Sequence, residues 1–119
     1  MNSKEIRYLV VELTTEDAWG SWELLWSVSG EAREQGFTDV REEFMQTIQT
    51  LINEKKIVAL KHPSPNEYLE VAFDPTRLAF EVENASNPDP DSFYWFEATD
   101  EGKKEYERES KLKFANPSR

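Results

Sequence analysis

Residues 38–60 read TDVREEFMQTIQTLINEKKIVAL, and this stretch decides which kind of fold the chain adopts. Its apolar residues recur at the 3.6-residue period of a helix that buries one side. They are Val40, Phe44, Ile48, Leu51 and Ile52. Thr38 starts this helix, carboxylates occupy its early turns and two lysines close it, as the helix dipole favours. The period then changes to two at residues 57–60, which predicts a strand that ends before the turn at residues 62–65.

Two further helices are predicted upstream of this stretch. The residues Ile6, Leu9, Val10 and Leu13 follow i, i+3, i+4, i+7 spacing. This spacing predicts a first helix over residues 3–13. A strand is the alternative, because residues 7–11 are rich in residues that favour strands. The second helix is expected to start at Thr14, where carboxylates follow the capping residue, and to run to about Val28, with Gly30 as its stop.

Downstream, two short runs alternate apolar with polar residues. The first run is Leu69, Val71 and Phe73, and the second is Leu78, Phe80 and Val82. With a turn at residues 74–76 between them, the runs predict a β-hairpin. A loop rich in Asn, Pro and Asp then leads to a last strand at residues 93–96 and a final helix over residues 99–113. Residues 113–119 are expected to be a frayed tail.

The order of these elements, three helices and then a strand, a hairpin and a strand, is that of a winged helix. Residues 38–61 resemble the part of such domains that runs from the recognition helix into the wing. Residues 94–103, YWFEATDEGK, resemble the close of the wing in MarR-like and PadR-like regulators, where a strand leads into Thr-x-x-Gly and a helix. The resemblance implies an α+β, winged-helix-like fold. It has three N-terminal helices, a small antiparallel sheet with an enlarged wing, and a C-terminal helix, in one domain over residues 1–119.

The composition limits the classes of partner. The chain has 119 residues, with 14 Lys and Arg against 24 Asp and Glu, so its net charge is −10. Such a charge repels nucleic acid and anionic membranes and attracts basic partners. The absence of cysteine excludes disulfides and thiolate metal sites. No signal-peptide pattern and no apolar run near the ~20 residues of a membrane span occur, so a cytoplasmic protein with no membrane contact is expected.

The polar side of the predicted helix at residues 38–55 is the candidate partner-binding surface. Its residues are Asp39, Glu42, Glu43, Gln46, Gln49 and Asn53. The three carboxylates lie at the end where winged-helix regulators approach DNA, and DNA binders need Lys and Arg there. The predicted wing is acidic as well, through Glu81, Glu83, Asp89 and Asp91. These features favour a non-catalytic regulatory protein that engages a basic protein partner, for example a basic enzyme that it inhibits as an immunity-type protein does.

A DNA-binding transcriptional regulator is the alternative that the resemblance implies. It requires the few cations of the chain to converge on one surface. The cations in question are Arg41, Lys55, Lys56, Lys61, Arg77, Lys103 and Lys104. A homodimer, which the sequence leaves open, would bring two such surfaces together.

A small-molecule binder or an enzyme is the third interpretation, and it depends on a tryptophan-rich helix alone. Trp19, Trp22 and Trp26 have the spacing of one helix face, which is either core or a binding platform. His62, the single histidine, is expected on the surface of a turn. The acidic loop at residues 89–91 lacks the Gly and Glu of a calcium-binding EF-hand. No catalytic residue, metal site or cofactor is predicted.

Overall fold

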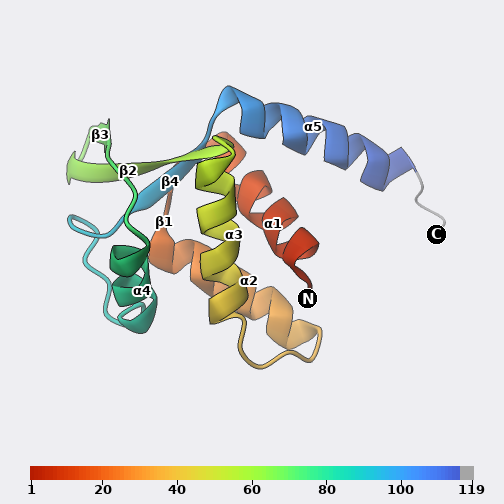
Figure 1. The fold of residues 1–119 in the computed structure, drawn as a ribbon, viewed down its shortest axis with the longest axis horizontal. Coiled ribbons are helices and arrows are strands. Elements are labelled where there is room, and N and C mark those ends of the chain that lie inside the picture. Colours follow the sequence, from red (N-terminus) through yellow and green to blue (C-terminus); the bar gives the residue numbers. More distant parts are fainter. Residues whose placement is uncertain (116–119) are drawn as a thin grey trace.

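The computed structural model describes residues 1–115, which form five helices and a four-stranded antiparallel sheet (Figure 1). The elements are α1 (Ser3–Glu16), β1 (Trp19–Gly20), α2 (Ser21–Glu34), α3 (Arg41–Asn53), β2 (Ile57–Ser64), β3 (Glu67–Glu70), α4 (Pro75–Glu83), β4 (Trp95–Ala98) and α5 (Asp100–Ala115). The strand order is β1-β4-β2-β3. The expected α+β class is therefore confirmed. None of the helices in residues 1–115 is both long and apolar enough to cross a membrane.

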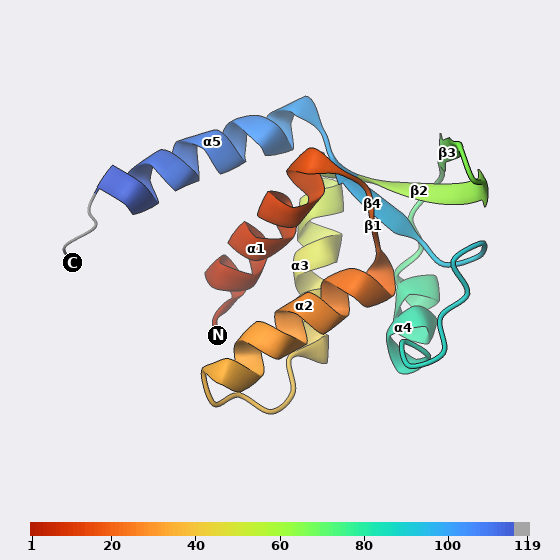
Figure 2. The same ribbon diagram turned by 180° about the vertical axis from the view of Figure 1, so that it is seen from behind.

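The helices α1 to α4 gather on one side of the sheet, and α5 leads away from the end of β4 (Figures 1 and 2). The core lies between the sheet and these helices. Its most deeply buried large side chains include Ile6, Leu24, Phe44, Ile48, Leu51, Ile57, Leu78 and Phe96. The apolar side predicted for the third helix is confirmed, since four of its five residues are buried and Ile52 is partly buried against the core.

The N-terminal segment is a helix, so the alternative of a strand is wrong. Asn2 caps it through a capping box, because its side chain accepts from the Glu5 N–H at 2.9 Å while its own N–H donates to Glu5 Oε1 at 3.1 Å. The expected restart at Thr14 is also wrong. Thr14 is buried inside α1 and donates its hydroxyl hydrogen to the Val10 carbonyl at 2.8 Å. The helix therefore continues to Glu16.

A two-residue strand separates α1 from α2. One continuous helix was expected over residues 14–28, so this break is a correction. Trp19 and Gly20 pair with Phe96 and Trp95 of β4. The ring of Trp22 lies against Gly20 so closely that a Cβ there would sit 2.4 Å from it. Trp19 is consequently in a strand, Trp22 is buried and Trp26 is 52% exposed, so the three tryptophans do not share one helix face.

The predicted stop at Gly30 is wrong as well, because α2 continues to Glu34. The chain turns at Gly36, whose φ of 90° lies in the left-handed region that glycine favours. Gly30 lies within the helix, and nothing would contact a Cβ there within 4 Å.

The predicted hairpin between residues 69–73 and 78–82 is wrong. The strand β2 extends through His62 to Ser64, and it pairs with β3 at Leu60–Glu70 and Lys61–Leu69. Residues 75–83 are helical, because the Asp74 side chain accepts from the Thr76 N–H at 2.9 Å and Pro75 occupies the first turn, where its missing N–H costs nothing. Leu78 and Val82 lie on the buried side of this helix, whereas Phe80 is 48% exposed.

The last strand begins two residues later than expected. Phe93 and Tyr94 are buried before the strand, and β4 pairs with β1 on one edge and β2 on the other. The helix α5 then continues to Ala115, which includes the first residues of the expected frayed tail. The rest of that tail, residues 116–119, lies outside the described part of the chain.

Candidate functional site

The outward side of α3 carries the predicted partner-binding residues. Glu42, Glu43, Gln46 and Asn53 are exposed, and Gln49 is partly buried. Gln46 donates to Glu42 Oε1 at 3.3 Å, and Gln49 donates to Asn53 Oδ1 at 3.0 Å. These bonds join residues one helical turn apart, so the polar side chains form a continuous row. No Lys or Arg among residues 1–115 forms an ion pair with Glu42 or Glu43.

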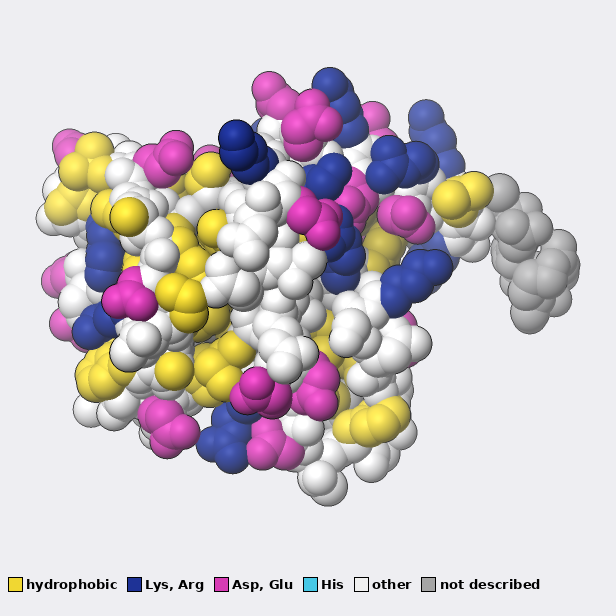
Figure 3. Space-filling view, in the orientation of Figure 1, with side chains coloured by type: hydrophobic (Ala, Val, Ile, Leu, Met, Phe, Trp, Pro, Cys, Tyr) yellow, Lys and Arg dark blue, Asp and Glu magenta, His cyan; other side chains and the backbone are white. Residues whose placement is uncertain are grey.

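The space-filling view looks onto this side of α3 (Figure 3). Side chains that are neither charged nor hydrophobic cover the middle of the helix, and carboxylates gather at its lower, N-terminal end. The surface therefore combines an acidic end with a neutral row of amide groups that can donate and accept hydrogen bonds.

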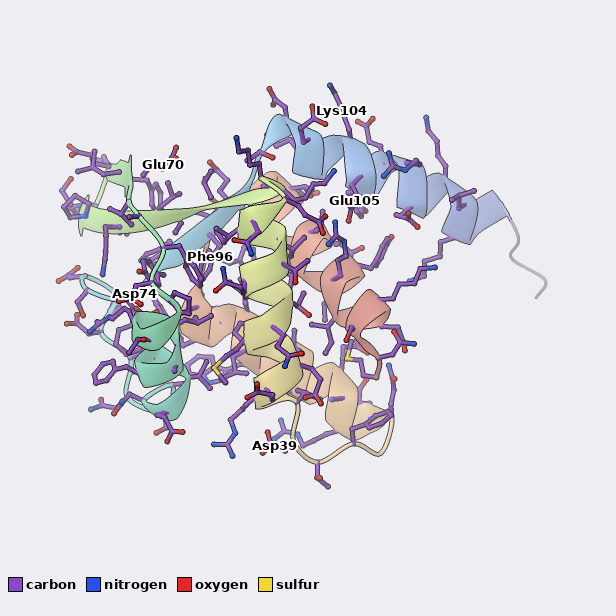
Figure 4. All side chains as sticks on the ribbon, in the orientation of Figure 1. Asp39, Glu70, Asp74, Phe96, Lys104 and Glu105 are labelled. Carbon is purple, nitrogen blue, oxygen red and sulfur yellow. The ribbon has the colours of Figure 1, made fainter. Side chains whose placement is uncertain are left out.

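Asp39 lies outside the helix, because α3 begins at Arg41 and not at Thr38 (Figure 4). Its carboxylate accepts from the Arg41 backbone N–H at 3.0 Å and forms an ion pair with the Arg41 guanidinium at 2.9 Å. These hydrogen bonds lower the pKa of Asp39 to about 2. Asp39 and Arg41, which were assigned to opposing hypotheses, thus neutralise each other at the start of the helix.

The seven cations of the DNA-binding alternative do not form one free basic surface. Four of them face carboxylates: Arg41–Asp39 at 2.9 Å, Lys56–Glu105 at 3.7 Å, Arg77–Glu81 at 3.1 Å and Lys104–Glu101 at 3.4 Å. Lys61 donates to the Ser92 carbonyl and lies over the ring of Tyr94. Lys55 and Lys103 are exposed near the junction of α3 and α5, where basic and acidic side chains alternate (Figure 3).

A buried carboxylate, Glu81, is the main polar feature that sequence analysis missed. Its side chain is fully buried in α4, although it was expected in an acidic wing. It accepts from the Ser21 hydroxyl at 2.6 Å, from the Tyr94 N–H at 3.0 and 3.1 Å, and from Arg77 Nε at 3.1 Å. All its donors come from other turns or elements, so Glu81 fixes α4 to the start of α2 and to the residue before β4.

An aromatic cluster occupies the face of the sheet that points away from the core. His62 was expected in a turn, but it lies in β2 between two rings. It stacks on Tyr68 with centroids 4.4 Å apart, and its centroid lies 5.2 Å from that of Trp95. Trp95 in turn contacts Trp22 edge-on at 5.2 Å. The cluster joins β2, β3, β4 and α2, which only tertiary structure brings together.

His62 and Asp89, two further polar residues considered in the sequence, contact neighbouring groups of the chain. In the described residues, no group of three His, Cys, Asp or Glu side chains is placed to hold a metal ion. The His62 Nδ1 atom lies 2.9 Å from the Glu67 carbonyl oxygen. Asp89 accepts from the Asp91 N–H at 3.1 Å and from the Ser92 hydroxyl at 2.8 Å, so its carboxylate stabilises the loop.

A groove of about 650 Å³ runs between α1 and α5. Its lining mixes apolar side chains such as Leu9 and Leu112 with charges of both signs. Arg7 crosses its floor and bonds to both oxygens of Glu105, which lowers the pKa of that carboxyl group. The Arg7 guanidinium and the Glu105 carboxylate in this groove therefore pair with each other.

Comparison with protein-family models, with curated proteins and with solved structures finds no match to this chain.

Proposed function

We propose that this protein is a non-catalytic binding protein of the cytoplasm that engages a protein partner with a basic surface. It would act as an inhibitor of that partner or as a regulatory subunit. One observation carries the proposal: the acidic end of α3 is exposed and holds Glu42 and Glu43 without a cationic partner in the described residues. Unpaired carboxylates on a rigid helix are available to Lys and Arg side chains of another protein.

The overall charge supports the same class of partner. A net charge of −10 accelerates the encounter with a basic protein and slows the encounter with phosphates. Gln46 is bonded to Glu42 at the acidic end, and Asn53 lies at the opposite end of α3. Their amide groups supply hydrogen bonds that do not depend on charge. Salt should therefore weaken the association mainly through its rate of formation.

A winged-helix-like framework is part of this proposal. The succession of three helices, α1 to α3, and then strand β2 supports this framework, and so does the antiparallel pairing of β2 with β4. In this reading α3 corresponds to the recognition helix, β2 and β4 form the wing, and β3 with α4 is an insertion within it. The insertion is a strand and a helix, whereas a hairpin was expected.

The DNA-binding alternative has the element order in its favour, but the pairing of its cations counts against it. Of the seven, four face carboxylates and Lys61 is engaged with Ser92. Phosphate contacts require cations that are free to displace counterions.

Affinity capture from the native host with two baits tests the proposal. The baits are the wild-type protein and the double variant Glu42→Lys/Glu43→Lys, each at low and high salt. We expect a basic protein on the wild-type bait at low salt, with clear loss of it at high salt and on the variant. Two outcomes would contradict the proposal. One is a captured protein whose yield is unchanged by high salt and by the α3 substitutions, and the other is tight binding of duplex DNA to the wild type in a mobility-shift assay.

A further inference from the structure

The outer face of the sheet, the face that points away from α1–α4, is a second surface with a defined chemistry. Cross-strand pairs fix its members: Trp95 lies opposite Leu60, and Glu97 lies opposite Val58. Phe96 and Ala98 alternate with these residues and are buried in the core, so Trp95 and Glu97 point outward. The helices α1–α4 lie on the other side of the sheet (Figures 1 and 2), and α2 reaches the outer face through Trp22, whose ring contacts Trp95.

Aromatic rings build a rigid platform on the outer face. Tyr68 is 40% exposed, with its ring stacked on His62 and its centroid 5.7 Å from that of Trp95. The Trp95 indole N–H donates to the Pro90 carbonyl at 2.9 Å, which fixes that ring. Leu60, on the same face, is only 7% exposed although it lies outside the main core cluster. Neighbouring groups of the chain therefore fix the orientation of these rings.

Glu97 lies on the same face of the sheet as this platform, because it is opposite Val58 and two residues after Trp95. Burial raises the pKa of Tyr68, and the negative charges of Asp17, Glu23 and Glu97 raise it further. Glu97 is exposed and has no ion pair within the described part of the chain. Lys61, the cation of β2, lies on the opposite face over Tyr94.

Cations already lie over aromatic rings elsewhere in the molecule. Lys61 lies over Tyr94, Arg77 over Phe80 and Phe93, and Lys113 over Tyr8. Within the described residues, Tyr68 and Trp95 have no such cation. An exposed ring beside unpaired carboxylates attracts a cation by its quadrupole and by charge together.

We infer that the outer face, formed by Tyr68, His62 and Trp95 with Glu97 at its edge, binds an arginine side chain presented by a basic protein partner. This inference rests on the proposed function, and it names a contact surface beyond α3. The planar guanidinium stacks on a ring while its N–H groups reach a carboxylate, which the compact ammonium of lysine cannot do equally well. Nucleic acid bases also stack on aromatic rings, but the carboxylates repel their phosphates.

Two peptides serve as probes in place of the partner: hexa-arginine and hexalysine, titrated at low salt and followed by NMR. We expect saturable shifts of the Trp95 indole N–H signal and of the Tyr68 and Glu97 amides. Hexa-arginine should bind more tightly than hexalysine. Tyr68→Ala should weaken hexa-arginine binding at least about fivefold, while Tyr68→Phe, which keeps the ring, should stay within about twofold of the wild type.

Tyr68→Ala could disrupt the β2–β3 hairpin, which would be seen as loss of the β2–β3 amide signals. In that case the binding of hexa-arginine to Glu97→Gln provides the test. Glu97→Gln should weaken binding, whereas Glu107→Gln, an exposed position on α5, should not. Shifts confined to α3 with equal affinity for both peptides would overturn the inference and leave the proposed function intact. Oligothymidine binding at the same signals would also overturn it, and so would the absence of any peptide binding. Failure of the proposed function would appear in the separate capture experiment, as a captured protein whose yield changes neither with the α3 substitutions nor with salt.

Discussion

Arg7 of α1 and Glu105 of α5, which are 98 positions apart in the sequence, form a bidentate ion pair with Nε–Oε2 at 2.8 Å and Nη2–Oε1 at 2.7 Å. Glu54 at the end of α3 adds a third contact to the same guanidinium at 2.7 Å. The first and last helices of the described chain are thereby attached to each other and to α3. Lys56 lies 3.7 Å from Glu105 on its other side.

Removing the charge of Glu105 should therefore loosen α5. Glu105→Gln is expected to lower the free energy of unfolding by about 2 kcal/mol, because a largely buried charge-assisted pair loses one partner. Urea denaturation at neutral pH measures the change. Glu107→Gln on the exposed side of α5 is the matched control and should stay within about 0.5 kcal/mol of the wild type. An equal effect of both variants would show that the ion pair does not hold the helix.

The same pair predicts a pH dependence of stability. The folded-state pKa of Glu105 is lowered from its usual 4.5. A lowered pKa means that the stabilisation is fully present above the unfolded-state pKa and is lost as pH falls through the folded-state pKa. The difference in unfolding free energy between the wild type and Glu105→Gln should thus be constant at neutral pH and should shrink at pH values below about 4.5. A difference that grows on acidification would contradict this assignment.

Charge reversal at the start of α3 should separate binding from folding. Glu42→Lys/Glu43→Lys is expected to lower the free energy of unfolding by about 1 kcal/mol and to leave the protein folded, because both side chains are exposed but lie in the first turn of α3, where the helix dipole favours carboxylates. Association with a basic partner should slow, as stopped-flow mixing would record. The control, Glu34→Lys/Glu107→Lys, changes the net charge equally at exposed positions on α2 and α5. Equal slowing by both variants would mean that only the total charge matters.

The buried carboxylate of α4 should tolerate little change. Both carboxylate oxygens of Glu81 accept hydrogen bonds, so the amide N–H₂ group of Glu81→Gln would face a donor, such as the Tyr94 N–H, in place of an acceptor. The substitution also leaves Arg77 without its counterion. We expect a loss of about 2–4 kcal/mol in chemical denaturation. Glu83→Gln, exposed and two residues away, should cost almost nothing. A mild Glu81→Gln variant would mean that the network contributes little to stability.

Two glycines in helices should respond to alanine in opposite directions. A Cβ at Gly102 would lie 2.1 Å from the Lys56 carbonyl oxygen, whereas nothing lies within 4 Å of a Cβ at Gly30. Gly30→Ala should therefore stabilise the protein by up to about 1 kcal/mol through helix propensity. Gly102→Ala should destabilise it by about 1–3 kcal/mol despite the same propensity gain. Thermal unfolding of both variants checks the signs, and a stabilising Gly102→Ala would contradict the close packing of α5 on the α3–β2 turn.

Local sequence predicted the elements whose pattern is unambiguous. The 3.6-residue period of α3 identified its buried side, because five apolar residues over three turns fit no strand. The run Leu78-Ala79-Phe80-Glu81-Val82 was ambiguous, since its alternation also places Leu78 and Val82 one helical turn apart. The signal that settles it precedes the run: Asp74 caps and Pro75 occupies the first turn.

The rest of the surface depends on contacts that no local pattern encodes. Glu81 accepts a hydrogen bond from Ser21, which lies sixty positions away in the sequence. The pairing of Arg41 with Asp39 depends on the residue at which α3 begins. The strand at Trp19–Gly20 is two residues long, so only its partner β4 reveals it. The class of partner stays a prediction from the composition, because net charge does not depend on the fold.

The attachment of α4 limits how this domain can be redesigned. Replacing residues 65–92 with a short turn would leave the Ser21 hydroxyl and the Tyr94 N–H without their acceptor. It would also remove Leu78 and Val82 from the interior. A miniature version that keeps only α1–α3 and the β2–β4 pair would therefore lose part of its core. A transplant of the α3 surface onto another scaffold must carry α4 with it, or supply equivalent atoms in its place.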